Sequence, residues 1–313
     1  MRIRSGAAAF SVTTALAAVA TAGFSLAVVA LGWAVGTLVM LVLPLCRRRR
    51  EGLQAVTLMF GTGAMTAAVL GAERAFPADS TFPFVSGMLL LLLWRALCGR
   101  REGPGRVAAV LGLMLLPVFA AALLLGMREV SWREAVSGSG NWGQIVTAVA
   151  AASPWWALED EKRDKQSWRW YGAAAGTSLG LSLLTHGTLG AALAEAEQFP
   201  LYRAVQTVHI VNAQHAEALV AAAVLLGSFS ILLTLGEMTV SAVRSKPKED
   251  VRWKIAGVLV AVFLLEWAIR DAVGALSQPV RTVFWGLVPV GTLWLVFSTK
   301  TSKKAGQREG WGI

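Results

Sequence analysis

A long apolar run near residue 230 carries the polar side chains with the clearest chemical potential in this chain. The run covers about residues 215–243 and contains Ser228, Ser230, Thr234 and Glu237. Lipid tails form no hydrogen bonds with a hydroxyl or a carboxylate, so polar groups of a membrane helix are expected to face protein or a water-filled cavity. We therefore interpret this run, with the short amphipathic piece at 199–212 before it, as the wall of a small-molecule site.

Glu237 needs a compensating environment if this run crosses a membrane. An ionisable group inside a span costs roughly 2.5–3.5 kcal/mol on insertion scales, so it is expected to be paired, protonated or in contact with water. One interpretation is that Glu237 lines a polar pathway or meets the ligand's amino group; the other is that it extends to the cytoplasmic edge or pairs with Arg244. Glu266 lies nearer the outer edge of its own apolar run and is the weaker candidate.

The composition indicates a polytopic helical membrane protein. The 313 residues are 55% hydrophobic and only 15% charged, with a mean hydropathy of +0.57, whereas soluble domains carry roughly 25% charged residues. The charges cluster between apolar runs of about 17–25 residues, the length that crosses a bilayer as a helix. We predict ten membrane spans, at about residues 7–22, 24–45, 53–72, 82–98, 106–127, 142–158, 169–190, 215–243, 254–270 and 282–299.

The basic residues determine the predicted orientation of these spans. Of the 29 Lys and Arg residues, 23 fall at the termini and in the loops of one side, and six fall on the other. Positive charge is retained in the cytoplasm, so both termini are expected to be cytoplasmic. This topology also explains the formal net charge of +10, and no nucleic-acid partner is predicted.

The first 45 residues allow two interpretations. An unbroken helix over the 40 apolar residues would be about 60 Å long, twice the membrane thickness, so we expect two spans that turn near Gly23. Alternatively, Arg2, Arg4 and the small residues Ala20–Ala22 resemble a cleavable signal peptide. Cleavage would leave the orientation of all later spans unchanged.

Ten spans with both ends inside form a single transmembrane domain, 1–313, that divides into two inverted halves. Residues 1–141 would be the first five-helix half, and residues 142–313 the second half with a cytoplasmic tail. In folds built from inverted repeats, the first helix of each half is interrupted at the midplane. The candidate breaks are residues 11–14 and residues 147–153, which Pro154 follows; the alternative is that these are ordinary small residues at helix contacts.

Metalloprotease, nucleotide-binding and metal signatures are missing from the sequence. There is no His-Glu-x-x-His motif and no P-loop. His209 and His215 are six residues apart and do not share a helix face, and His186 is remote from both. We predict a protein that is not an enzyme, with no catalytic residue, no metal and no cofactor.

The stretches at residues 75–117, 159–165 and 199–229 resemble the B subunit of spore germinant receptors, within the amino acid–polyamine–organocation transporter superfamily. Residues 75–117 are similar to the family's proline-containing turn, helix and arginine-containing start of the next span. Residues 159–165 resemble a polar patch, and residues 199–229 resemble the outer helix that runs into the eighth span. His215 departs from the family, which usually has an arginine there.

The resemblance implies a 5+5 leucine-transporter-type bundle that senses an amino-acid-type germinant at the membrane midplane. It also implies the spore inner membrane as location, and A-type and C-type receptor subunits as partners. The positions that match the pocket are Thr13, Thr14, Thr62, Thr66, Thr147, Ser230, Leu233 and Glu237. Depth and polarity nominate most of these independently, though not Leu233.

Two other functions remain open on the sequence. A secondary amino-acid transporter coupled to an ion would share the fold, and fold does not separate transport from sensing. A membrane enzyme acting on a lipid-linked substrate would instead depend on a cytoplasmic carboxylate such as Glu159 or Asp160.

Overall fold

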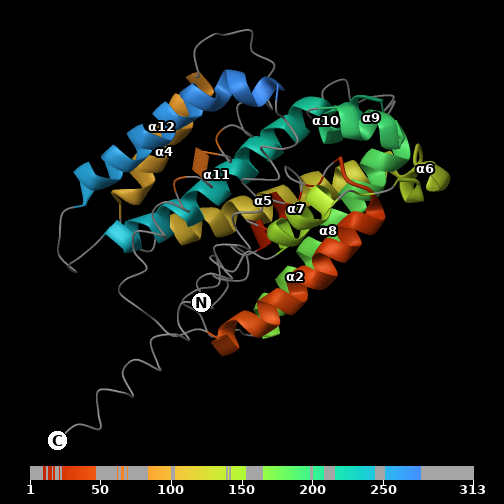
Figure 1. Ribbon diagram of the computed structural model, residues 1–313, viewed down its shortest axis with the longest axis horizontal. Helices are drawn as coiled ribbons and strands as arrows, with labels where there is room; N and C mark the ends of the chain where they lie inside the picture. The colour runs from red at the N-terminus through yellow and green to blue at the C-terminus, as the bar shows by residue number, and fades with distance from the viewer. Residues whose placement is uncertain are drawn as a thin grey trace, which may run out of the picture.

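Helices make up all the regular secondary structure that the computed structural model describes (Figure 1). The structure describes residues 23–46, 84–99, 103–138, 140, 142–152, 165–197, 200–207, 216–243 and 251–275, with residues 10, 11, 13–15, 17, 21, 62, 65, 66 and 69 in two further helical segments. The predicted span at 282–299 lies outside these residues. The prediction of an all-α chain is confirmed for the described part.

The long helices coincide closely with the predicted apolar runs. Their bounds are α2 Leu26–Cys46, α4 Phe84–Leu97, α5 Gly103–Gly126, α7 Trp142–Ala152, α8 Lys165–Leu189, α11 Ala216–Val243 and α12 Arg252–Ala275. The short helices are α6 Trp132–Val136, α9 Ala191–Ala196 and α10 Pro200–Thr207. Along the bundle, α2 packs against α7, α5 against α11, and α4 against α12 (Figure 1).

Length and hydropathy single out one described stretch, Gly105–Gly126 in α5, that is able to cross a membrane. It has 22 residues and a mean hydropathy of 2.6. The stretches Leu26–Val39, Phe84–Leu97 and Leu225–Glu237 are apolar but shorter. The described helices therefore establish the all-α class, and the ten-span arrangement is taken up below as a proposal.

The N-terminal segment, residues 10–21, lies in the core. Its described residues are helical and all buried: Phe10, Ser11, Thr13, Thr14, Ala15, Ala17 and Thr21. Phe10 packs against Trp170 of α8 with ring centroids 5.5 Å apart, and Ala15 belongs to the same apolar cluster as Leu233 of α11. A helix that is buried on several sides is the centre around which the others pack.

The chain turns at Gly23 and Phe24, which confirms the predicted turn between the first two spans. Two side chains of α8 satisfy the carbonyl groups of this turn. His186 Nε2 lies 3.0 Å from the Gly23 oxygen, and the Ser182 hydroxyl donates to the Phe24 oxygen at 2.8 Å. A Cβ at Gly23 would lie 2.5 Å from the Ala194 oxygen, so a glycine is required where α9 covers the turn.

The two predicted helix breaks are wrong within the described residues. Residues 10, 11 and 13–15 are all helical, and α7 is continuous to Ala152; Ser153 and Pro154 lie outside the described part. The Thr147 hydroxyl donates to the Gly143 oxygen at 2.8 Å, a bond that α-helical geometry accommodates without opening the helix. At the end of α7 the Tyr171 hydroxyl donates to the Ala152 oxygen at 2.6 Å, which satisfies a terminal carbonyl group.

Candidate functional site

A contact between two buried hydroxyl groups joins the N-terminal segment to α11. The Oγ atoms of Ser11 and Ser230 lie 2.5 Å apart, and both side chains are 0% exposed. One turn before Ser230, a Cβ at Gly227 would lie 2.8 Å from the Cβ of Ala15. Small residues therefore allow the two helices to approach closely at this point. Ser230 was among the predicted ligand residues, whereas Ser11 was named only as part of a helix break.

Thr14 is a further buried hydroxyl group of the N-terminal segment, three residues after Ser11. It is 0% exposed, and its Oγ1 has no hydrogen-bond partner among the described residues. Ser11 and Thr14 are three residues apart and are therefore neighbours on the surface of the N-terminal segment. We call Ser11, Thr14 and Ser230 the hydroxyl seam.

The hydroxyl seam has unused hydrogen-bonding capacity. A pair of hydroxyl groups has two protons, and only one of them lies between the Ser11 and Ser230 oxygens. The second proton and the Thr14 hydroxyl are able to donate to another acceptor. Buried polar groups are nearly always satisfied, so an unsatisfied one calls for a specific explanation such as a ligand or a water molecule.

Three threonines of the predicted span interiors use their hydroxyl groups within their own helices. Thr66 donates to the Thr62 oxygen at 2.9 Å, and Thr147 and Thr234 make equivalent bonds to Gly143 and Ser230. Such bonds to the carbonyl group four residues earlier occupy the hydroxyl proton. Thr66 and Thr147 are therefore less available to a ligand than Thr14 is. Thr13 is fully buried, and Thr62 is half-buried.

Leu233 lies in an apolar cluster rather than beside polar groups. The cluster includes Ala15, Met65, Ala151 and Leu233, which come from the N-terminal segment, residues 62–69, α7 and α11. The tertiary structure thus brings together the four segments that carry the predicted ligand residues. At Leu233 itself the contacts are those of a packed core.

Glu237 lies outside the hydroxyl seam. It is seven residues after Ser230, on the same face of α11 but about 10 Å further along the axis. There the helix face emerges at the surface, and the Glu237 side chain is exposed. The structure therefore favours the interpretation in which Glu237 extends to the edge over the one in which it meets the ligand.

This position leads to a prediction about Glu237→Gln. Because the side chain is exposed and about 10 Å from Ser230, the substitution is expected to leave the ligand concentration for half-maximal response unchanged within about twofold. Titration of the response with Glu237→Gln and wild-type protein side by side checks this. An increase of tenfold or more in the ligand concentration for half-maximal response would instead show that Glu237 contributes to ligand binding.

Glu266 of α12 is the carboxylate that the structure buries. Its side chain is 0% exposed, while the neighbouring Leu264, Leu265 and Trp267 are exposed. The spacing of residues in the sequence already indicates this burial. Glu266 follows Ile255, Leu259 and Val262 at helical spacing, and these three side chains are buried as well. Glu266 therefore shares the inward face of α12.

No protein-family model and no curated protein sequence matches this chain. The geometry of the described residues and the resemblance of the sequence are therefore the basis of the functional assignment. In the described residues the geometry shows an all-helical arrangement with a buried contact between hydroxyl groups of the N-terminal segment and α11.

Proposed function

We propose that this chain is a membrane-embedded receptor subunit that binds a small nutrient molecule at the hydroxyl seam. The role would be like that of the B subunit of spore germinant receptors, which the sequence resembles. The observation that carries the proposal is the direct contact of Ser11 with Ser230, together with the unpartnered Thr14 hydroxyl three residues after Ser11. These groups are buried where lipid and bulk water do not reach.

The outer faces of several helices support residence in a membrane. Large apolar side chains of α5 are exposed along its length: Val107, Val110, Leu113, Met114, Leu116, Leu124 and Leu125. Soluble proteins rarely expose contiguous apolar patches of this kind, and lipid tails would cover them. The proposal is a ten-span 5+5 bundle with both termini cytoplasmic, located in the spore inner membrane with A-type and C-type subunits.

The seam favours a ligand with a strong hydrogen-bond acceptor, such as the carboxylate of an amino acid. Hydroxyl groups donate to an anionic oxygen in bonds that are stronger than those between neutral groups. Because Ser11 and Ser230 touch each other, a ligand that enters between them must separate the N-terminal segment from α11. Binding would therefore shift the protein from a closed state to one in which the seam is open.

Removing one seam hydroxyl tests this arrangement. Thr14→Val and Ser230→Ala are each expected to raise the ligand concentration for half-maximal response about 5- to 10-fold, because each deletes one hydrogen bond of about 1 kcal/mol to the ligand. Thr177→Val is the matched control, since Thr177 is in α8 and its hydroxyl donates only to the Ala173 oxygen. The measurement is nutrient-triggered dipicolinate release from spores of the source organism.

Deletion of the gene completes this experiment. Loss of the response to one nutrient class, with germination by non-nutrient agents intact, would support a receptor subunit. Unchanged germination, combined with substrate uptake by the purified protein alone, would contradict the receptor function. It would favour a secondary transporter that binds its substrate at the same seam. Equal effects of Thr177→Val and Thr14→Val would contradict the assignment of the seam.

A further inference from the structure

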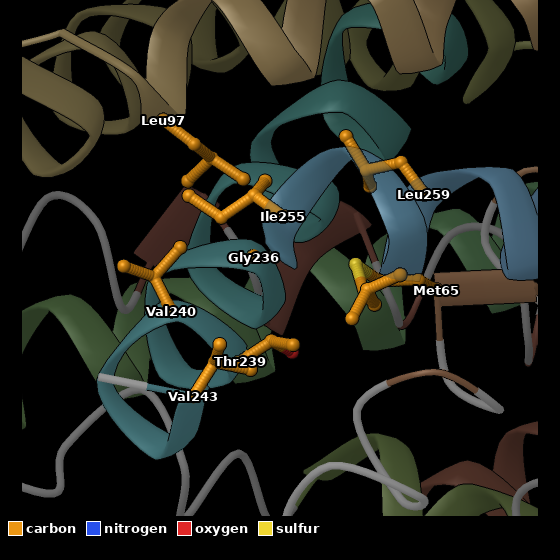
Figure 2. Close-up of a pocket in the computed structure, with 9 residues that line it drawn as sticks. Met65, Leu97, Gly236, Thr239, Val240, Val243, Ile255 and Leu259 are labelled. Carbon is orange, nitrogen blue, oxygen red and sulfur yellow. The ribbon is translucent and has the colours of Figure 1, made fainter. Parts of the chain in front are cut away.

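The crevice between α4, α11 and α12 has room for about one water molecule (Figure 2). Its volume is about 10 Å³. Thr239 is the polar residue of its lining, and the Thr239 hydroxyl donates to the Leu235 oxygen at 2.8 Å. The crevice is therefore a small gap in the packing of the helices, and a larger partner has to bind at the outer surface.

Three large apolar side chains are exposed around the connection between α5 and α7, which contains the short helix α6. Trp132 is 63% exposed, Val136 is 67% exposed and Trp142 is 82% exposed. Trp132 and Val136 are four residues apart and share one face of α6. Arg133, on the same helix, is exposed as well. We call Trp132, Val136 and Trp142 the apolar rim.

Contacts with the end of α8 fix the position of α6. The Ser131 N–H donates to the Gly187 oxygen at 2.9 Å. A Cβ at Gly187 would lie 2.5 Å from the Val130 Cγ1 and 3.5 Å from the Ala135 Cβ, and Ala135 is 0% exposed. The small residue of α6 therefore packs on α8, and the large apolar residues of α6 stay exposed.

The rim lies close to the end of the stretch that is able to cross a membrane. Residues Gly105–Gly126 of α5 would extend about 33 Å, close to the roughly 30 Å thickness of the hydrocarbon. Gly126, the last of them, packs against Leu184, which is three residues before Gly187 on α8. Since α6 is bonded to Gly187, it begins only about 5 Å beyond the end of the apolar stretch.

Trp142 is attached at a similar depth. A Cβ at Gly138 would lie 3.7 Å from the His186 Cε1, and Gly140 packs against Val28 of α2. The backbone that leads to Trp142 therefore passes the last turn of α8 and then the first turn of α2. In a membrane, both tryptophans of the rim would lie near the level where hydrocarbon meets the lipid headgroups.

A polar surface lies beyond the rim. The helices α9 and α10 cover the turn at Gly23, where a Cβ would lie 2.5 Å from the Ala194 oxygen and 3.1 Å from the Pro200 Cγ. On the exposed face of α10, Arg203 Nη1 donates to Gln206 Oε1 at 3.0 Å. At this end of the bundle the exposed surface thus changes from apolar on α5, through tryptophan and arginine on α6, to polar on α10 (Figure 1).

We propose that the apolar rim inserts into the headgroup region of the leaflet opposite the cytoplasm, so that its partner is the phospholipid surface. Tryptophan suits this level because its ring is apolar and its N–H group is polar. The exposed Arg133 guanidinium is suited to a headgroup phosphate. The inference rests on the membrane residence in the proposed function, but not on the ligand of the hydroxyl seam. The rim would fix the depth of α5 and of the end of α8 in the bilayer.

The test measures the depth of single spin labels on the full-length protein in vesicles of phosphatidylglycerol and phosphatidylcholine. The background variant is Cys46→Ser/Cys98→Ser, and single labels are attached to Trp132→Cys, Val136→Cys and Trp142→Cys. Collision rates are measured with oxygen, which dissolves in lipid, and with a nickel complex, which stays in water. The oxygen-to-nickel ratio of each rim label is expected to be about threefold or more above that of Gln206→Cys on α10, and below that of Met114→Cys on α5.

The two control labels distinguish failure of the rim from failure of membrane residence. Nickel access at the rim equal to that at Gln206 would overturn the inference. Rim labels that neither reagent reaches would overturn it too, because a second copy of the chain would then cover the rim. If the label at Met114 still favours oxygen in either case, membrane residence stands, whereas free nickel access at Met114 would contradict the proposed function itself.

Discussion

Gly32→Leu is expected to lower the melting temperature by about 5 °C. Gly32 of α2 is buried against α7, and a Cβ at this position would lie 2.8 Å from the backbone carbonyl carbon of Ala148 and 3.1 Å from its Cα. A backbone cannot rotate aside as a flexible side chain can, so the two helices must separate. Overpacking of this kind costs about 3 kcal/mol, which corresponds to several degrees in a chain of this size.

Gly172→Leu is the matched control for this prediction. Gly172 is in the middle of α8, and a Cβ there would meet no atom within 4 Å. The same change of residue should therefore leave the melting temperature within about 2 °C of the wild type, because no neighbour must move. The two variants are compared by thermal melting in detergent, followed by size-exclusion chromatography. Similar losses for both would show that α2 and α7 do not pack as described.

His186→Ala is expected to destabilise the fold by about 2–4 kcal/mol. The imidazole is 0% exposed, and the Gly23 oxygen is only able to accept, so Nε2 carries a proton and donates it at 3.0 Å. Alanine would leave a buried carbonyl group unsatisfied and a cavity of the size of the ring. The loss is measured by thermal melting together with hydrogen exchange of the amides at residues 23–25.

Two amide variants distinguish the stability lost with the hydrogen bond from the stability lost with the volume of the side chain. The glutamine nitrogen reaches the position of Nε2, so His186→Gln should recover at least half of the loss, whereas the shorter His186→Asn should not. Faster exchange at residues 23–25 is expected in His186→Ala and His186→Asn only. If glutamine and asparagine behave alike, the bond to Gly23 is not what stabilises the turn.

Different contacts hold the two ends of the N-terminal segment. At the turn, His186 and Ser182 bind two consecutive carbonyl groups and α9 packs on Gly23. Near the other end, Phe10 packs against Trp170 and Ser11 contacts Ser230 of α11. Under the proposed function, a ligand that separates Ser11 from Ser230 moves this end of the segment while the turn stays in place.

Much of the fold could be predicted from the sequence. The apolar runs at 24–45, 106–127, 169–190 and 215–243 became α2, α5, α8 and α11 with ends within a few residues of those expected. In lipid, an apolar run of this length must satisfy its backbone groups internally, which is why the composition predicted helices. Likewise, 40 apolar residues are too long for one span, which places a turn at the glycine near their middle.

The site could be predicted only in part. Burial of Thr14 and Ser230 was expected from residue type and depth, because hydroxyl groups in apolar helices are expected to face protein, and both side chains are 0% exposed; their role in ligand binding stays a prediction. The partner of Ser230 was not identified, since Ser11 is 219 positions away and no local pattern connects the two residues. Thr66 and Thr147, like Thr14, are threonines within predicted apolar spans. Their hydroxyl groups, however, donate to carbonyl groups of their own helices.

The sequence by itself determined that this protein is helical, where its long helices run and where its first hairpin turns. Only the tertiary structure decided that Glu266 is buried and Glu237 exposed, and that His186 holds the turn at Gly23. The physical reason is that helix formation depends on the residues of one segment. Which face of an almost uniformly apolar helix turns inward depends instead on the neighbours that pack against it.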